Sequence, residues 1–190
     1  ICYREIRELE EHVDEPDYIR LYLSQKWAPG GYTWLFPEDG KKVNVGVGVT
    51  MFSGFPNPKN QLYDSILSMP IFKGSSVMKA GTWYDPARRP PECMTGNGIV
   101  IVGDAACQVN PIHGGGIGPS MMGGYTAGKA IIEAMEKGDL SRDGLWSYNI
   151  KYMQLYGASQ ASLDVFRLFF HGVGDDDLNY GMQHRLVTEE

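Results

Sequence analysis

The sequence Gly98-Ile-Val-Ile-Val-Gly-Asp-Ala-Ala106 is followed closely by Pro111-Ile-His-Gly-Gly-Gly-Ile-Gly118. The β-branched run in the first segment is typical of a strand covered on both faces. Asp104 then lies where the carboxyl ends of strands meet ligands in α/β folds. The glycines of the second segment let a flat or anionic ligand approach the backbone, and Pro119 suits the first turn of a helix whose N–H groups attract negative charge. We therefore predict a strand, a ligand-binding loop and a helix.

A second pattern combines an aromatic strand with a glycine-rich one. The residues of Tyr32-Thr-Trp-Leu-Phe-Pro37 alternate, so the three aromatic side chains share one face of a strand. In the following strand, Val43 to Val49, the valines share one face and Asn44, Gly46 and Gly48 share the other. An aromatic face beside a face without side chains predicts a shallow slot for a planar ring or an unbranched hydrocarbon. A hairpin whose aromatic residues fill a core fits the periodicity equally well.

Both patterns resemble known motifs. Residues 98–118 resemble the second flavin-binding motif of the FAD-dependent oxidoreductases related to p-hydroxybenzoate hydroxylase. Tyr-x-Trp-x-Phe-Pro, eight residues and Gly-x-Gly form the signature of the geranylgeranyl reductases, which residues 32–48 match position for position. The resemblance is greatest to the archaeal digeranylgeranylglycerophospholipid reductases, which saturate the isoprenoid chains of membrane lipids. It is strong over roughly residues 18 to 137.

The resemblance implies two sets of binding residues. Asp104 would bind a ribityl hydroxyl of FAD, and Gly115, Gly116 and Ile117 would offer amides to the flavin. The cofactor-binding set implied is Asp104, Pro111, Gly114, Gly115, Gly116, Ile117 and Gly118. The substrate-binding set implied is Tyr32, Trp34, Phe36, Pro37, Gly46 and Gly48. No catalytic residue and no metal ligand is assigned.

The chain departs from these reductases in length. They are about twice as long and open with a Rossmann Gly-x-Gly-x-x-Gly fingerprint, which is absent here, while this chain begins at Ile1 within a predicted strand. We therefore expect a C-terminal part of a flavoenzyme whose partner is the missing N-terminal FAD-binding half. We expect this chain alone to bind FAD weakly or not at all and to be inactive, because the phosphate-binding loop is missing.

The predicted fold class is α+β. It comprises an antiparallel substrate-domain sheet, the C-terminal part of an FAD-binding domain and C-terminal helices, over residues 1–90, 91–140 and 141–190. Strands are expected at 1–11, 18–27, 32–37, 43–51 and 75–84, and a helix at 58–69 with Asn57 as its N-cap. Further helices are expected at 119–137, ending at Gly138, and beyond residue 145, with a break near Gly157 and a polar end after Gly172.

Composition restricts the function classes. The formal charge of −6 argues against nucleic acid as the main partner. There is no signal peptide and no apolar run long enough to span a bilayer. Three widely spaced cysteines fit a reduced cytoplasmic protein without a zinc site. We expect a cytoplasmic location, with a peripheral place at the membrane left open.

Other local patterns have plainer explanations. Residues 123–129 nearly form a phosphate-binding P-loop, but Ala130 stands where Ser or Thr must reach magnesium. Gly124 and Gly128 have the spacing of a membrane helix-pairing motif, yet charged residues interrupt the helix, so we expect both glycines to pack against a neighbouring element. The helical stripe after Leu145 fits either a lipid tunnel or a buried helix face. A Cys107–His113 nucleophile pair lacks any orienting group.

The resemblance to the reductases also implies a reaction mechanism. Because an isolated trisubstituted alkene is not an electrophile, we expect protonation to a tertiary carbocation before hydride arrives from reduced flavin. Trp34 would face the developing charge. The substrate would be an isoprenoid lipid and the electron donor a nicotinamide cofactor, ferredoxin or another carrier. Alternatives are a halogenase or monooxygenase of the same fold, or a non-catalytic lipid-binding module.

Overall fold

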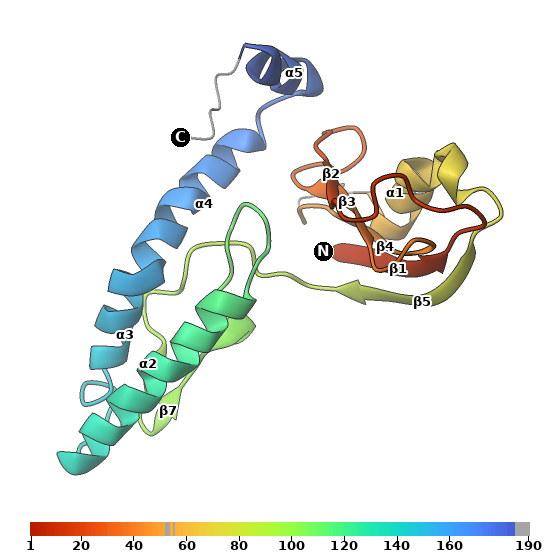
Figure 1. The fold of residues 1–190 in the computed structure, drawn as a ribbon. Coiled ribbons are helices and arrows are strands. Elements are labelled where there is room, and N and C mark those ends of the chain that lie inside the picture. Colours follow the sequence, from red (N-terminus) through yellow and green to blue (C-terminus); the bar gives the residue numbers. More distant parts are fainter. Residues whose placement is uncertain (52–53, 55, 185–190) are drawn as a thin grey trace. The chain divides into compact units, whose positions relative to one another are not determined.

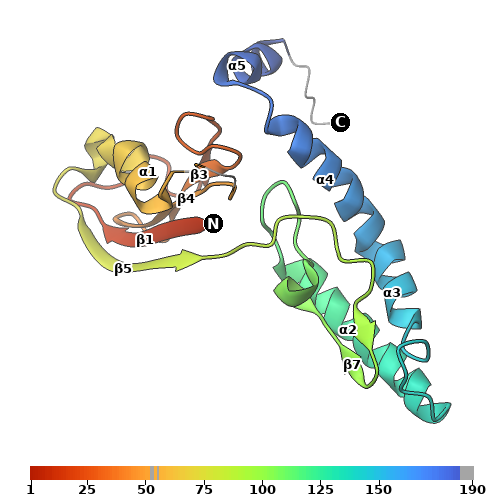
Figure 2. The same ribbon diagram turned by 180° about the vertical axis from the view of Figure 1, so that it is seen from behind.

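The computed structural model describes residues 1–51, 54 and 56–184, which fall into two compact units. Unit 1 contains Ile1–Tyr84 and the chain from Phe170 onward, and unit 2 is Asp85–Phe169. An antiparallel sheet lies in unit 1 and most of the helical residues lie in unit 2 (Figures 1 and 2). The α+β class is confirmed.

The sheet of unit 1 has five antiparallel strands in the order β2-β3-β4-β1-β5. They are β1 (Cys2–Glu8), β2 (Arg20–Tyr22), β3 (Tyr32–Pro37), β4 (Lys42–Gly48) and β5 (Ser76–Trp83). The predicted hairpin of β3 and β4 is confirmed: Trp34 lies opposite Gly46, and the turn contains Asp39 and Gly40.

One face of this sheet carries the core of unit 1. The four valines from Val43 to Val49 are buried there with Tyr3 and Leu35. The helix α1 (Pro58–Asp64) and the short 3-10 helices η1 (Ile66–Ser68) and η2 (Pro70–Phe72) contribute Leu62, Ile66 and Phe72 to the same cluster. Asn57 caps α1 as predicted, accepting from the Lys59 N–H at 2.9 Å. The α-helix ends five residues earlier than expected, and the two 3-10 helices η1 and η2 follow it.

One strand prediction for unit 1 is wrong. The strand expected at 18–27 is limited to β2, because the chain turns at Ser24–Ala28, where the Ala28 N–H donates to Ser24 O. The polar segment after Gly172 contains the helix α5 (Asp175–Gln183), whose acidic first turn complements the helix dipole. Asp175 of this helix accepts from Ser24 Oγ at 2.8 Å and from the Gln25 N–H at 2.5 Å, which holds that turn.

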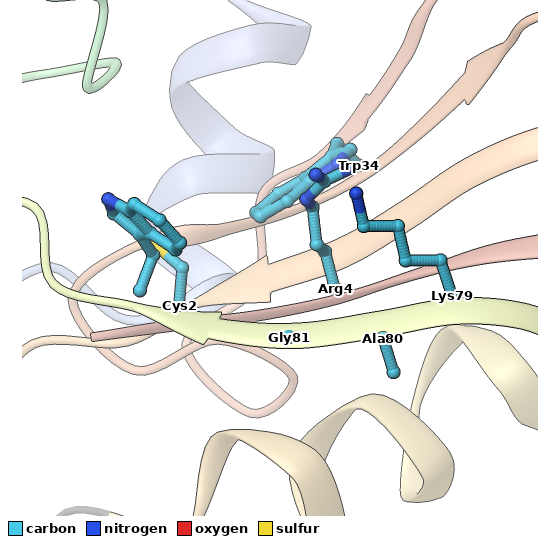
Figure 3. Close-up of a pocket in the computed structure, with 7 residues that line it drawn as sticks. Cys2, Arg4, Trp34, Lys79, Ala80 and Gly81 are labelled. Atoms are coloured by element: carbon cyan, nitrogen blue, oxygen red, sulfur yellow. The ribbon is translucent and has the colours of Figure 1, made fainter.

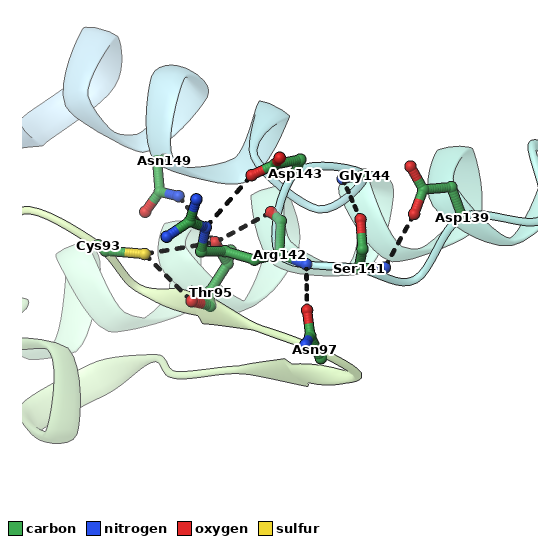
Figure 4. A network of polar contacts seen from close by, with 9 residues as sticks. All are labelled: Cys93, Thr95, Asn97, Asp139, Ser141, Arg142, Asp143, Gly144 and Asn149. Atoms are coloured by element: carbon green, nitrogen blue, oxygen red, sulfur yellow. Dashed lines mark hydrogen bonds and ion pairs between the residues drawn. The ribbon is translucent and has the colours of Figure 1, made fainter.

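Unit 2 contains a two-stranded ribbon in place of the longer strand that the β-branched run after Gly98 predicts. The paired strand is β7 (Ile99–Val100), whose partner is β6 (Thr95–Gly96), and the 3-10 helix η3 (Gly103–Ala106) follows. No other described strand pairs with β7, so Ile99 remains 61% exposed rather than covered on both faces. Loop residues 139–144 pack on this ribbon: the Arg142 N–H donates to Asn97 Oδ1 at 3.0 Å (Figure 4).

The helices of unit 2 largely match expectation. The helix α2 (Ile117–Glu136) begins two residues before Pro119, and Gly138 follows it with φ +68°. The helices α3 (Ser147–Tyr152) and α4 (Ala158–Phe170) are continuous through the π-helical turn η4 (Met153–Gly157). The expected irregularity near Gly157 is therefore confirmed as a π-helical turn.

The aromatic stripe after Leu145 is buried in its first part and exposed in its second. Tyr148 and Tyr152 are fully buried, as in a buried helix face, whereas Phe166 and Phe169 are 58% and 67% exposed. A Cβ added to Gly124 or Gly128 would meet no described atom within 4 Å, so the expected close packing at these glycines is wrong among the described residues. Gly123 is the packed glycine of α2, because its neighbour is the Gln108 side chain. Across the described part of the chain, no helix combines the length and apolar character needed to cross a bilayer.

Candidate functional site

The outer face of the sheet in unit 1, opposite the valine core, carries the aromatic residues of the signature. Tyr32, Trp34 and Phe36 form a row with ring centroids 5.9 Å and 6.1 Å apart. Their strand neighbours Thr33 and Leu35 are buried on the core face. The aromatic row therefore lies outside the core, and the alternative in which these rings fill the core is wrong.

Gly46 provides the floor beneath this row. A Cβ at this position would overlap the Trp34 indole, so the ring itself occupies the space that the missing side chain leaves. The indole N–H also donates to Asn44 Oδ1 at 3.1 Å, which fixes the plane of the ring. The slot expected from the sequence is thus floored by glycine but partly filled by Trp34. Gly48 lies opposite Tyr32, and Pro37 ends the strand opposite Val43.

A pocket of about 470 Å³ opens on the same sheet beside Trp34 (Figure 3). Its lining residues come from β1, β3 and β5: Cys2, Arg4, Trp34, Lys79, Ala80, Gly81 and Trp83. Of these, only Trp34 belongs to a pattern that is recognisable in the sequence. The other lining residues were not predicted, because β1 and β5 become neighbours only in the folded sheet. The residues of these two strands match no known motif. Arg4 faces Gly81 across the β1–β5 ladder, which a sequence pattern does not reveal.

The glycine loop of unit 2 brings an acceptor and several donors together. Asp104 Oδ1 lies 3.5 Å from the position that a Cβ on Gly116 would take. The Asp104 carboxylate is exposed and makes no hydrogen bond or ion pair with another described residue. The amide N–H groups of Gly116, Ile117 and Gly118 likewise have no acceptor within the described part of the chain. A carboxylate and uncapped amides at the start of a 20-residue helix therefore remain available to a ligand.

Other amides of the loop are already used. The Gly115 N–H donates to His113 Nδ1 at 3.1 Å and the Gly114 N–H to Asn110 O at 2.9 Å, so both amides form hydrogen bonds within the loop. Asn110 Oδ1 accepts from the Ile112 N–H at 2.8 Å, which forms the turn that contains the buried Pro111. Asn residues favour such side-chain turns, so Asn110 was a signal for this turn that the predictions did not include.

Buried amide side chains support the loop from below. The Gln108 side chain is fully buried, accepts from the Gly103 N–H at 2.8 Å and donates to Tyr148 Oη at 2.5 Å. Gln160 donates to Val109 O at 2.8 Å and accepts from Tyr152 at 2.9 Å. Since buried polar groups need partners, these bonds fix the loop relative to α3 and α4. Nothing in their spacing along the chain indicated this role.

Asp85 adds a titratable group to the loop. A Cβ on Gly114, whose φ is +72°, would collide with Asp85 Oδ2, so the carboxylate lies directly against the loop backbone. Burial, with a further contribution from the nearby negative charge of Asp104, raises the pKa of Asp85 to about 6. An acid with this pKa retains part of its proton near neutral pH.

Two further polar side chains of unit 2, Cys107 and Arg89, have surroundings that explain them without a catalytic role. Burial raises the pKa of the Cys107 thiol, which disfavours the thiolate that a nucleophile requires. Arg89 lies 3.5 Å from the buried Asp164 carboxylate, so this cation is already paired.

Residues 1–82 match the family model described as the geranylgeranyl reductase catalytic domain. The whole chain is 43% identical to a digeranylgeranylglycerophospholipid reductase of Sulfolobus acidocaldarius. The chain is similar along its length to members of the geranylgeranyl reductase family. A second member of this family, the digeranylgeranylglycerophospholipid reductase of Methanothrix thermoacetophila, is 32% identical over 93% of the chain. The chain spans 42% and 44% of the lengths of these two relatives.

Two solved structures have a fold similar to that of this chain. A geranylgeranyl bacteriochlorophyll reductase-like protein from Thermoplasma acidophilum has a TM-score of 0.84 and 27% identity, and the alignment covers 94% of this chain and 46% of that protein. The flavin-dependent halogenase CmlS has a TM-score of 0.61 at 18% identity, covering all of this chain and 38% of its own. The second likeness shows a shared fold alone.

Proposed function

We propose that this chain supplies the substrate-binding sheet and a flavin-contacting segment of an FAD-dependent reductase that saturates isoprenoid double bonds in membrane lipid precursors. The observation that carries the proposal is the free Asp104 carboxylate beside the uncapped amides of Gly116, Ile117 and Gly118. FAD combines hydroxyl donors on its ribityl chain with a pyrophosphate and carbonyl acceptors. These groups complement a carboxylate and a helix N-terminus.

The implied cofactor residues fit this group with one modification. Asp104 would accept from a ribityl hydroxyl, and the amides that start α2 would bind the acceptors. Gly114 and Gly115 would shape the loop rather than donate, because their N–H groups are bonded within it. When bound and reduced, the flavin supplies the hydride that saturates an alkene.

The aromatic row would hold the isoprenoid chain. Three neighbouring rings above glycine offer an elongated apolar surface, which suits an extended prenyl chain better than a compact polar substrate. An aromatic face stabilises a nearby cation by about 0.5 to 2 kcal/mol. The Trp34 ring, fixed by its bond to Asn44, is therefore proposed to stabilise positive charge on the protonated alkene. The lipid class is proposed from the relatives named above, and the reductant remains a nicotinamide cofactor, ferredoxin or another carrier.

The cofactor role is tested by flavin content. In the intact protein that contains this chain, Asp104→Ala should lower the flavin retained after gel filtration at least about ten-fold, because the loss of a charged hydrogen bond is worth about 1.5–3 kcal/mol. Asp104→Asn retains an acceptor oxygen and should lose less. Glu136→Ala removes an exposed acid at the far end of α2 and serves as the control. Unchanged flavin content in Asp104→Ala would contradict the proposed cofactor site.

The substrate role is tested by product analysis. Trp34→Leu should lower turnover of a prenyl lipid about ten-fold, whereas the same change at Trp146, in unit 2, should have no effect. Unchanged turnover and product pattern in Trp34→Leu would remove this residue from the proposal. An oxygenated or halogenated product would favour the monooxygenase or halogenase alternative, and lipid binding without flavin reduction by any donor would favour a binding module.

A further inference from the structure

The pocket beside Trp34 has a charge that sets it apart from the rest of the chain. Its lining includes two cationic side chains, Arg4 and Lys79, and no acidic one. The protein as a whole carries a formal charge of −6. Figure 3 shows the Arg4 and Lys79 side chains rising from the sheet on the same side as Trp34, with their nitrogen atoms near the indole. The pocket is therefore a local positive site on an acidic protein.

These two cations are unpaired. Neither side chain forms an ion pair or hydrogen bond with another residue in the described ranges. Other basic residues of the sheet are neutralised: Lys42 lies 2.6 Å from Glu38, and Arg20 lies 3.7 Å from Glu15. Unpaired surface cations are common where each is simply solvated, but here two of them share one pocket.

The register of the strands brings the two charges to one place. Arg4 on β1 lies opposite Gly81 on β5, and Lys79 lies opposite Ile6, so the two residues are diagonal neighbours on adjacent strands. Side chains at diagonal positions are about 7–8 Å apart at their bases, within reach of one another for long side chains. Like charges at this spacing repel each other, and an anion bound between them would replace that repulsion with attraction.

The chemistry of the pair favours phosphate. A guanidinium group binds two phosphate oxygens at once, and an ammonium group binds phosphate as a point charge. The adjacent aromatic row is apolar, so a ligand that fits both surfaces has an anionic end and a hydrocarbon chain. Resting on the proposed function, we infer that Arg4 and Lys79 bind the phosphate group of the prenyl lipid while its chain lies along Tyr32, Trp34 and Phe36.

The test compares two probes that differ only in phosphate. Binding of geranylgeranyl phosphate and of geranylgeraniol to the intact protein is measured by calorimetry in the same detergent. Arg4→Gln and Lys79→Gln should each weaken binding of the phosphate about ten-fold or more and leave binding of the alcohol unchanged. Lys73→Gln removes an exposed cation from the loop before β5, outside the pocket, and should change neither. Higher salt should weaken binding of the phosphate only.

The outcomes separate this inference from the proposed function. Equal wild-type affinity for both probes, or equal losses for both in the variants, overturns the phosphate site and leaves the prenyl site intact. Failure of the wild-type protein to bind either probe overturns both. Inorganic phosphate serves as a third probe: weak competition against geranylgeranyl phosphate alone supports a lipid phosphate, and binding as tight as that of the prenyl phosphate overturns the lipid assignment in favour of a free anion.

Discussion

Glycine serves opposite purposes in the two units. On the outer face of the sheet, Gly46 makes room for the molecule's own Trp34 indole, and the space is filled. In the loop of unit 2, glycines leave the backbone bare, and the N–H groups of Gly116 and Gly118 remain without acceptors among the described residues. The first site is held by aromatic packing and the second by buried polar side chains. A cluster of glycines therefore indicates a site without indicating which physical property the site uses.

The largest expected effect concerns the polar support of the loop. Gln108→Leu removes the acceptor for the Gly103 N–H and the donor to Tyr148, and should destabilise unit 2 by about 2–3 kcal/mol, because a buried donor without a partner loses its solvation. Denaturant unfolding with hydrogen exchange in α2 measures this loss. Gln154→Leu, at an exposed position in η4, is the control. Equal effects of the two changes would show that polar bonding does not hold the loop.

The aromatic packing is tested at its floor. Gly46→Ala places a methyl group where the Trp34 ring lies, so the ring must move and unit 1 should lose about 1–3 kcal/mol. Near-UV circular dichroism and thermal unfolding report the displaced indole. Gly81→Ala, on the neighbouring strand β5, meets no described atom within 4 Å and is the matched control. An unchanged indole signal in Gly46→Ala would separate the glycine from the aromatic row.

Asp85 should make the stability of unit 2, which contains the glycine loop, depend on pH. Its pKa is raised from 3.8 to about 6, so the folded chain holds a proton that the unfolded chain releases across this window. The stability of unit 2 should therefore fall as the pH rises from about 4 to 6 and stay constant above. Asp85→Asn should remove this dependence and stabilise the protein at pH 7 by about 1 kcal/mol, a value reduced by the solvent exposure of the carboxylate. Unfolding measured from pH 4 to 8 gives the sign, and parallel curves for both proteins would contradict it.

The smallest expected effect concerns two glycines of α2 that neither make room for a side chain nor belong to the glycine loop. Gly124→Ala and Gly128→Ala lie within α2, where alanine is the better helix former and an added Cβ meets no described atom within 4 Å. Each change should stabilise the helix by about 0.5–1 kcal/mol. Gly123→Ala, which would collide with Gln108, should destabilise it instead. Destabilisation by Gly124→Ala in a thermal scan would reveal a surface that packs on this side of α2.

The sequence alone determined the features that depend on local order. Alternation in residues 32–48 predicted the β3–β4 hairpin and its two faces, and the turn and capping residues predicted α1, the end of α2 and the irregularity at Gly157. These features depend on side-chain direction and backbone preferences, which neighbouring residues largely set. The similarity to the reductase family followed from the same two motifs, because both are contiguous segments.

Only the tertiary structure decided which residues share a site. Sheet register places Arg4 and Lys79 beside Trp34, and the packing of α3 and α4 brings Tyr148 and Gln160 beneath the glycine loop. The longer strand that the β-branched run after Gly98 predicts failed for the same reason, since its apolar pattern has no further strand to pair with among the described residues. Contacts between distant segments depend on register and helix packing, and a one-residue change of register would exchange the two faces of a strand.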